Sequence, residues 1–266
     1  MKIGIVGMGK MGEALAKGLR DRDAKKYQII GSTRTQASAD ESAKHLSIRV
    51  HTDNAKIAAD SDVVILCVKP HQAEKVLKEM SPQLTREHLL ITICAAVTSE
   101  QAHTWGGGKA AAIRAMPNTP ALIGEGMTVL CAGPNVQPAQ LETAEQLFRA
   151  VGLTAIVEES LMDGVTGLSG CGPAYIYLII ESLSEAGVKV GLPRETATLL
   201  ATQTLLGSAK MVLQRGVHPA ALKDEVTTPA GCTIDGLMAL EEGKLRVTLI
   251  KAVLAATKRS KSLRGV

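Results

Sequence analysis

The chain has 266 residues, of which 45% are hydrophobic and 21% are charged, a balance typical of globular rather than disordered proteins. One Trp, three Tyr and one Phe are too few to build the aromatic platforms on which nucleic-acid modules stack bases, and they leave an aliphatic core. The net charge of +4 does not by itself indicate a polyanionic partner.

Short apolar runs alternate with helical patterns along the first 160 residues. We expect strands at Lys2–Val6, Tyr27–Gly31, Asp62–Val68, His88–Ile93, Ala110–Ala115 and Met127–Cys131. Helices are expected at Lys10–Arg20 and His71–Met80. Because the apolar runs lack polar alternation, they suit strands buried on both faces of a parallel sheet. The alternation of strands and helices predicts a doubly wound α/β sheet with right-handed crossovers.

The pattern changes near residue 160, after which only helices are predicted. Their expected ranges are Ala174–Val188, Arg194–Gln214, Thr233–Glu242 and Leu245–Leu263. We therefore expect a sheet domain over residues 1–160 and an all-helical domain over residues 161–266. The first half of Ala174–Val188 is apolar all round, which predicts a helix buried on every side. A domain of this size rarely buries such a helix alone, so a subunit interface is the expected cover.

A glycine motif directly follows the first strand. It reads Gly7-Met8-Gly9-Lys10-Met11-Gly12 and opens the first helix, which is the context that a G-x-G-x-x-G fingerprint requires. Gly7 allows a tight turn, Gly9 lets a pyrophosphate approach the backbone, and Gly12 lets the helix pack on the strand. The motif predicts a Rossmann-type dinucleotide site with contacts from Gly7, Gly9, Lys10, Met11 and Gly12.

The end of the second strand indicates which dinucleotide is bound. NAD-binding proteins usually place an Asp or Glu there, but this chain has Ser32, Thr33 and Arg34. Hydroxyls and a guanidinium suit a 2′-phosphate, so we expect NADPH (NADP+), with NADH as a less preferred cofactor. The alternative is that Arg34 is an ordinary solvated loop residue. Asn54 is a further expected cofactor contact.

Two later loops also follow predicted strands. Val68-Lys69-Pro70 and the segment around Asn118 lie where ligands of such sheets bind, beyond the carboxyl ends of the strands. We expect cofactor contacts from Val68, Lys69, Pro70 and Asn118. A solvated loop lysine and a plain structural turn are the respective alternatives.

Glycines at the start of the first helix after residue 160 indicate which class of reaction the protein catalyses. Gly167, Gly170 and Gly172 follow the frame that β-hydroxyacid dehydrogenases carry there, but the position of their acid/base lysine is Ile176. An isoleucine cannot transfer a proton. Oxidation of an alcohol needs such a group and reduction of a protonated imine does not, so the missing lysine favours C=N chemistry.

Over nearly its whole length the chain resembles the pyrroline-5-carboxylate reductase family. The resemblance is carried by the glycine motif and by residues 68–70, 116–120, 167–175, 218–219, 222–224 and 226–234. Residues 226–234, Val-Thr-Thr-Pro-Ala-Gly-Cys-Thr-Ile, match the family's signature loop. Small departures are Ala230 where Gly is common, Cys232 where Ala or Thr is common, and Cys171 where Ser is common.

The signature loop is a Pro/Gly turn that runs into a helix. Gly231, Cys232 and Thr233 would present backbone N–H groups at the helix N-terminus, which suits a carboxylate. The resemblance implies that Thr228, Gly231, Cys232 and Thr233 bind the substrate, and that the Thr233 hydroxyl contacts the ring nitrogen as the catalytic contact. The alternative is a plain N-cap, in which Thr228 or Thr233 only satisfies helix donors.

The resemblance implies hydride transfer from NADPH to Δ1-pyrroline-5-carboxylate, which gives L-proline in the last step of proline biosynthesis. It also implies a homodimer with interleaved helical domains, assembled in some members into larger rings. Five widely spaced cysteines without C-x-x-C predict a reduced cytoplasmic protein with no metal site, and no apolar run is long enough to span a membrane.

The basic stretch from Lys244 to Arg264 lacks interleaved aromatics and is interpreted as a solvated helix face rather than a nucleic-acid site. Three rival functions stay open. They are a reductase of another cyclic imine, a non-catalytic NADP sensor, and a purely structural or partner-binding protein.

Overall fold

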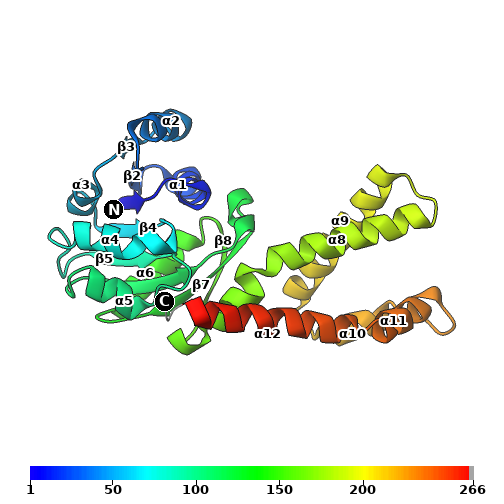
Figure 1. Ribbon diagram of the computed structural model, residues 1–266. Helices are drawn as coiled ribbons and strands as arrows, with labels where there is room; N and C mark the ends of the chain where they lie inside the picture. Colours follow the sequence, from blue (N-terminus) through cyan, green and yellow to red (C-terminus); the bar gives the residue numbers. More distant parts are fainter. Residues whose placement is uncertain (264–266) are drawn as a thin grey trace. The chain divides into compact units, whose positions relative to one another are not determined.

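The computed structural model describes residues 1–263 (Figure 1). By its internal contacts the chain divides into two compact units, one of residues 1–171 together with the end of the last helix from Leu254, and one of residues 172–253. These limits differ from the expected domains, residues 1–160 and 161–266, at both ends of the second domain. Of the expected basic stretch, Arg264 lies outside the described residues.

The first unit contains one eight-stranded sheet in the order β3-β2-β1-β4-β5-β6-β7-β8. The strands are β1 Lys2–Val6, β2 Gln28–Ser32, β3 Arg49–His51, β4 Val63–Leu66, β5 Leu89–Thr92, β6 Ala111–Met116, β7 Gly126–Ala132 and β8 Gly152–Ile156. All neighbours pair in parallel except β6 and β7, which are antiparallel. The predicted α/β class is confirmed, and each predicted strand agrees with an observed one to within two residues.

Helices cover this sheet and connect its strands. They are α1 Lys10–Asp23, α2 Gln36–Leu46, α3 Asn54–Ala59, α4 Pro70–Met80, α5 Ser99–Trp105, α6 Pro138–Phe148 and α7 Met162–Val165. Short 3₁₀ turns at Thr119–Ile123 and Glu159–Leu161 and a π-helical turn at Thr166–Gly170 complete the unit. Local sequence sets several helix starts: Pro70 and Pro138 stand at the first helical position, and Thr98 with Gln101 forms a capping box on α5.

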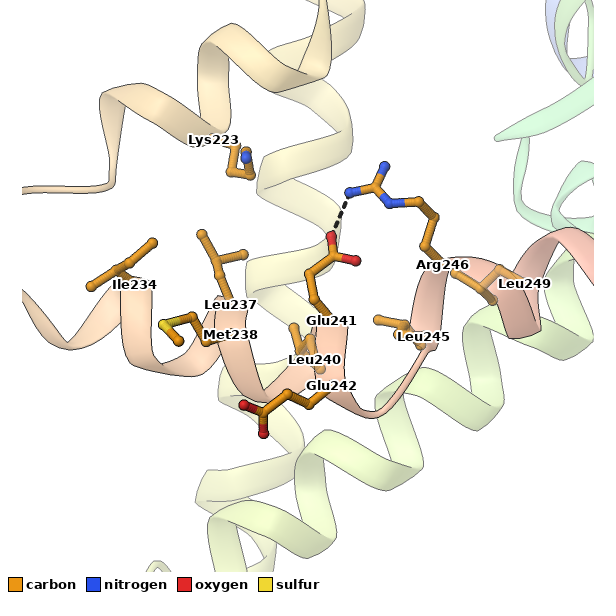
Figure 2. A pocket seen from close by; sticks show the side chains of 10 residues that line it. All are labelled: Lys223, Ile234, Leu237, Met238, Leu240, Glu241, Glu242, Leu245, Arg246 and Leu249. Carbon is orange, nitrogen blue, oxygen red and sulfur yellow. Dashed lines mark hydrogen bonds and ion pairs between the residues drawn. The ribbon is translucent and has the colours of Figure 1, made fainter.

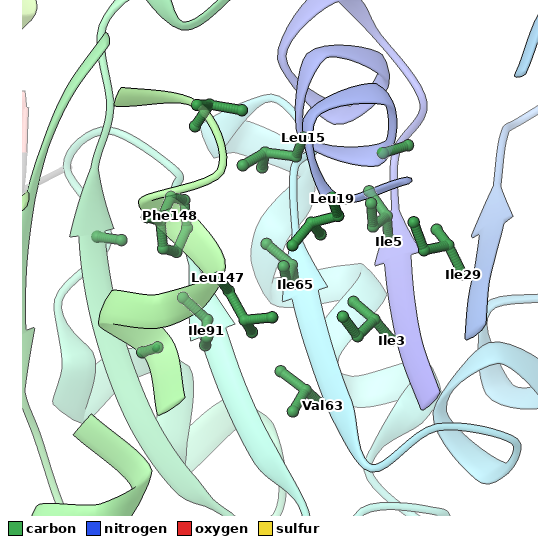
Figure 3. Close-up of a cluster of buried hydrophobic side chains, with 14 of the residues drawn as sticks. Ile3, Ile5, Leu15, Leu19, Ile29, Val63, Ile65, Ile91, Leu147 and Phe148 are labelled. Carbon is green, nitrogen blue, oxygen red and sulfur yellow. The ribbon is translucent and has the colours of Figure 1, made fainter. Parts of the chain in front are cut away.

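The apolar strands bury both faces of the sheet. Ile3 and Ile5 of β1 pack with Leu15 and Leu19 of α1 and with Phe148 of α6 on one face (Figure 3). The alternate residues of the strands pack against α3, α4 and α5 on the other face. Since successive strand residues point to opposite faces, a run without polar residues is what burial on two sides requires.

An ion pair between a buried arginine and a partly exposed glutamate connects elements in the second half of the sheet unit. Arg114 of β6 is 0% exposed, and its Nη1 donates to Glu159 Oε1 at 2.6 Å. The other Glu159 oxygen accepts from the Ser99 backbone N–H at 3.2 Å and hydroxyl at 2.7 Å. Arg114 Nη2 is buried without a hydrogen-bond partner among the described residues. The pair therefore joins β6, the start of α5 and the segment that leads into α7.

The second unit is helical. It contains α8 Gly172–Lys189, α9 Arg194–Arg215, α10 Pro219–Glu225, α11 Cys232–Glu242 and residues 245–253 of α12 Leu245–Leu263. The helix predicted at Leu245–Leu263 is confirmed at both ends, and α10 was not predicted. Between residues 1 and 263 no helix combines the length and the apolar character needed to cross a membrane.

Candidate functional site

A cavity of about 610 Å³ lies beyond the carboxyl ends of β1, β2 and β4. These strands are neighbours in the sheet, so the loops that follow them converge on one edge, where open α/β sheets bind ligands. Eight of the residues predicted for the cofactor line this cavity: Gly7, Gly9, Ser32, Thr33, Arg34, Asn54, Val68 and Lys69.

The three motif glycines are needed for different reasons. Gly7 has a φ of +98°, and a Cβ there would lie 2.9 Å from the Cys67 carbonyl group. A Cβ on Gly12 would collide with the Gly7 carbonyl oxygen. A Cβ on Gly9 would meet no protein atom within 4 Å. Gly7 and Gly12 are therefore required by the fold itself, whereas Gly9 leaves open space beside the cavity.

The residues present fit the pyrophosphate of a dinucleotide. Gly9 is the N-cap of α1 and carries no side chain that could occupy the first N–H groups of the helix. Free N–H groups and the positive end of the helix dipole favour an anion at this point. Burial raises the pKa of the Cys67 thiol well above its ordinary value, with the nearby Cys94 acting in the same direction. Cys67, which lines the cavity, therefore adds no negative charge there.

Five of the predicted cofactor residues do not line the cavity. Lys10 and Met11 lie in the first turn of α1, Gly12 packs on the Gly7 carbonyl, and Pro70 begins α4. Asn118 donates from Nδ2 to the Ser169 carbonyl at 3.2 Å, and its Oδ1 accepts from the Met127 N–H at 2.9 Å. Because both ends of this amide are engaged within the protein, the geometry favours a structural turn at Asn118.

The hydroxyls at the end of β2 and directly after it already donate their protons inside the protein. Ser32 donates to Asn54 Oδ1 at 2.7 Å, and Thr33 donates to the Thr35 carbonyl at 3.0 Å. A 2′-phosphate, which only accepts hydrogen bonds at neutral pH, would have to draw on another donor. The exposed Arg34 guanidinium lines the cavity and is the cation among these three residues.

Sequence reasoning missed further cavity residues. They are Met8, Thr35, Ser38, Thr52, Cys67, His71, Gln72, Lys75, Val76 and Glu79. Several of them lie on one face of α4, at the three- and four-residue spacing of Gln72, Lys75, Val76 and Glu79. That spacing was visible in the sequence, but only the strand order places this face of α4 against the cavity.

The predicted substrate loop lies in the second unit, between α10 and α11. The Gly231 N–H donates to the Thr228 carbonyl at 3.1 Å, which closes a β-turn with Pro229 at its second position. Ala230, at the third position, has a φ of +57°. Proline followed by a left-handed residue is the pattern of a type II turn, in which the third position is normally glycine.

The turn leads directly into α11, whose N-terminus has no side-chain cap within residues 1–263. Gly231 is the N-cap of α11, and no side chain of the described residues caps it. A Cβ on Gly231 would collide with Thr228 Oγ1, so a larger residue here would displace that hydroxyl. The alternative of a plain N-cap made by Thr228 or Thr233 is not observed. The first N–H groups of α11 are therefore free to bind a carboxylate.

Replacing Ala230 by glycine should relieve backbone strain. A left-handed conformation costs an L-residue roughly 1–2 kcal/mol, while glycine costs about 0.4–1 kcal/mol more entropy on folding. We expect Ala230→Gly to raise the free energy of unfolding by about 0.5 kcal/mol. Urea denaturation checks this, with Ala239→Gly in the middle of α11 as the control that should lower stability by about 1 kcal/mol. Equal losses in both variants would contradict the strained turn.

The second unit exposes a large apolar surface. Tyr177 and Leu178 of α8 are 61% and 62% exposed, although the sequence predicts burial on every side of this helix. A groove of about 580 Å³ lies at the junction of α11 and α12, and the Glu241–Arg246 ion pair (2.6 Å) is among its lining residues (Figure 2). Its apolar side chains are those of Ile234, Leu237, Met238, Leu240, Leu245 and Leu249. Apolar surface of this extent marks an interaction site.

Two family models match separate parts of the chain. Residues 2–96 match the family model described as NADP oxidoreductase coenzyme F420-dependent. Residues 159–263 match the model described as pyrroline-5-carboxylate reductase dimerisation. The chain is thus similar to a nucleotide-dependent oxidoreductase in its first part and to a dimerisation domain in its second.

Relatives that match the chain over nearly its whole length are named pyrroline-5-carboxylate reductase. The chain is 44% identical to a pyrroline-5-carboxylate reductase of Methanosarcina acetivorans, covering 98% of this chain and 97% of that protein. It is 40% identical to one of Arabidopsis thaliana over 98% of this chain and 95% of the relative.

Solved structures agree with these relatives. A pyrroline-5-carboxylate reductase of Coxiella burnetii superposes with a TM-score of 0.92 at 38% identity, covering 98% of this chain and 97% of that one. The Plasmodium falciparum pyrroline carboxylate reductase, solved with NADP bound, has a TM-score of 0.87 at 34% identity over 99% and 98% of the two chains. The protein described above, with its glycine-loop cavity and its uncapped helix after Thr-Pro-Ala-Gly, belongs to the pyrroline-5-carboxylate reductase family.

Proposed function

We propose that this protein reduces Δ1-pyrroline-5-carboxylate to L-proline with NADPH, the last step of proline biosynthesis. The observation that carries the proposal is the whole-length similarity to pyrroline-5-carboxylate reductases, at 44% identity over 98% of the chain. The open backbone at Gly9 and the uncapped α11 supply the two anion sites that a dinucleotide and a carboxylate substrate need.

The protein contributes to this reaction mainly by binding the cofactor and the substrate and orienting them. When bound, NADPH supplies the hydride that reduces the C=N bond. The free N–H groups at the start of α11 hold the substrate carboxylate, and the Thr233 hydroxyl positions the ring nitrogen. Ile176, which stands where related dehydrogenases have an acid/base lysine, transfers no proton. The substrate therefore reacts as the iminium ion that is already protonated.

Isotope transfer tests the reaction itself. With NADPH that carries deuterium at the reactive position of the nicotinamide, the product should be L-proline with one deuterium at the former imine carbon. Mass spectrometry and chiral chromatography identify it. Unlabelled proline would contradict hydride transfer from NADPH. A labelled six-membered ring formed faster from the homologous imine would favour the rival cyclic-imine reductase. Tight NADPH binding without turnover of any imine would favour the NADP sensor.

Thr233→Ala tests the proposed catalytic contact. We expect kcat/KM for the imine to fall by about 10- to 100-fold, because a hydrogen bond to a charged group contributes about 1.5–3 kcal/mol. The dissociation constant of NADPH should change less than twofold. Thr198→Ala on α9, whose hydroxyl donates to the Arg194 carbonyl of its own helix, is the matched control. A loss confined to NADPH binding would contradict the role of Thr233.

Arg34→Ala tests the choice of cofactor. Because Ser32 and Thr33 donate their protons within the protein, Arg34 carries the interaction with the 2′-phosphate. We expect NADPH affinity to fall by about 10- to 100-fold and NADH affinity to stay within about twofold. Nucleotide fluorescence measures both constants, with the exposed Arg86→Ala as a control. Unchanged NADPH affinity would make Arg34 the solvated loop residue of the alternative interpretation.

We also propose a homodimer in which α8 to α12 of two copies interleave, assembled further into a ring. The apolar surface of the second unit supports an oligomer. A stable monomer at micromolar concentration in analytical ultracentrifugation would contradict it.

The cysteine spacing supports a reducing compartment, and the proposed location is the cytoplasm. The proposed domain roles are NADP binding for residues 1–160 and substrate binding with dimerisation for residues 161–266.

A further inference from the structure

Glu79 belongs to none of the sequence motifs, yet it lines the dinucleotide cavity. It lies in the last turn of α4, and its Oε2 accepts a hydrogen bond from Asn54 Nδ2 at 3.3 Å. A carboxylate repels the phosphates of a dinucleotide and therefore gains nothing by contacting them directly. Its position against Asn54 indicates a different role.

The neighbours of Asn54 fix the orientation of its amide. The Ser32 hydroxyl, which is 0% exposed, donates to Asn54 Oδ1 at 2.7 Å. On the other side Glu79 can only accept, so the amide nitrogen must face it. If the amide were turned over, its oxygen would face the carboxylate with no proton between them. Ser32 and Glu79 together therefore hold the amide in one of its two orientations.

This orientation directs one donor into the cavity. An amide nitrogen has two hydrogens, and Glu79 takes one of them. Asn54 itself lines the cavity, so the second N–H is presented to a ligand there. The phosphate and hydroxyl oxygens of a dinucleotide are suitable acceptors. Without Glu79 the amide could rotate and present its oxygen to the cavity instead. An amide oxygen has no hydrogen to donate to a phosphate oxygen.

We propose that Glu79 is a positioning residue of the cofactor site, acting through Asn54 to present an amide N–H to the dinucleotide. The proposal rests on the proposed function, because it requires a nicotinamide dinucleotide in this cavity. The proposal places this N–H against a ribose or pyrophosphate oxygen that NADPH and NADH share, and leaves the 2′-phosphate to Arg34. Loss of Glu79 therefore weakens both cofactors by the same factor and leaves their ratio unchanged, unlike loss of Arg34.

The test measures dissociation constants of NADPH and NADH by nucleotide fluorescence, without substrate. Glu79→Ala should weaken both by about three- to tenfold, the value of one ordinary hydrogen bond. Glu79→Gln should stay within about twofold of the unaltered protein, because the glutamine oxygen still accepts from Asn54. Glu74→Ala, on the same helix but outside the cavity and paired with Lys78, is the control and should change neither constant.

A double-mutant cycle separates positioning from a general effect. In an Asn54→Ala background, Glu79→Ala should cause no further loss, because the group that Glu79 orients is absent. Additive losses would overturn the proposal. So would unchanged affinities in Glu79→Ala, a loss for NADPH alone, or a glutamine variant as weak as the alanine variant. Failure of the unaltered protein to bind either nucleotide would instead overturn the proposed function.

Discussion

Replacing Gly9 by alanine should lower NADPH affinity by about 10- to 100-fold while the fold is kept, since hydrogen bonds to charged groups contribute about 1.5–3 kcal/mol. A Cβ at this position meets no protein atom within 4 Å, and its φ of −85° suits alanine. The free energy of unfolding should therefore fall by no more than about 1 kcal/mol, the cost of a poorer N-cap. The added methyl group occupies the space that the pyrophosphate needs.

Gly12→Ala is the contrasting variant. Its Cβ would collide with the Gly7 carbonyl oxygen, so β1 and α1 must move apart. We expect it to lower the free energy of unfolding by about 1–3 kcal/mol in urea denaturation, even without nucleotide. If Gly9→Ala instead bound NADPH as tightly as the unaltered protein, the pyrophosphate could not lie against this loop.

Arg114 is fully buried and pairs with Glu159, whose side chain is 30% exposed. Glu159→Ala leaves the Arg114 guanidinium fully buried without an ionic partner, and its Nη2 already has no hydrogen-bond partner among the described residues. Leaving a buried charge without its ionic partner costs about 3–5 kcal/mol. Urea denaturation should show this loss, against a change below about 0.5 kcal/mol for the exposed neighbour in Glu158→Ala.

The same pair predicts a dependence on pH. Burial acts to raise the pKa of Glu159, but the hydrogen bonds from Ser99 and Arg114 outweigh it and hold the pKa below its ordinary value of 4.5. A carboxyl group with a lowered pKa stabilises the fold above its unfolded pKa, and this stabilisation is lost as the pH falls through the folded value.

The difference in stability between the unaltered protein and Glu159→Ala should therefore be constant above about pH 5 and shrink below about pH 4.5. Urea denaturation at a series of pH values measures it. Similar losses in Glu159→Ala and Glu158→Ala, or a difference that grows on acidification, would contradict this account of the pair.

The parts of the fold that burial dictates were predictable. The strand Lys2–Val6 and the helix Leu245–Leu263 have the predicted limits, because continuous apolar runs and helical periodicity mark them. The strands Arg49–His51 and Gly152–Ile156 were missed. Both lie at the edges of the sheet and are partly exposed, so ladder hydrogen bonds rather than an apolar run define them. The antiparallel pairing of β6 with β7 leaves no sign in either run.

The candidate site likewise has features that the sequence predicts and features that it does not. The glycine motif could be placed from sequence, because its spacing is a direct consequence of the turn that it makes. The left-handed φ of Ala230 could not, since alanine gives no signal for it. Nor could the role of Glu79, which depends on a strand order that brings α4 beside Asn54. From the sequence, the Ser32 and Thr33 hydroxyls were expected to contact a ligand. The structure shows that they donate to Asn54 and to the Thr35 carbonyl within the protein.

This protein is proposed to transfer hydride from NADPH to pyrroline-5-carboxylate. The most direct measurement is the loss of absorbance at the NADPH band on addition of that imine, beside the same reaction with NADH. We expect rapid oxidation of NADPH and slower oxidation of NADH. Equal or faster turnover with NADH would contradict the role of Arg34, and no turnover with either cofactor would contradict the reductase activity itself.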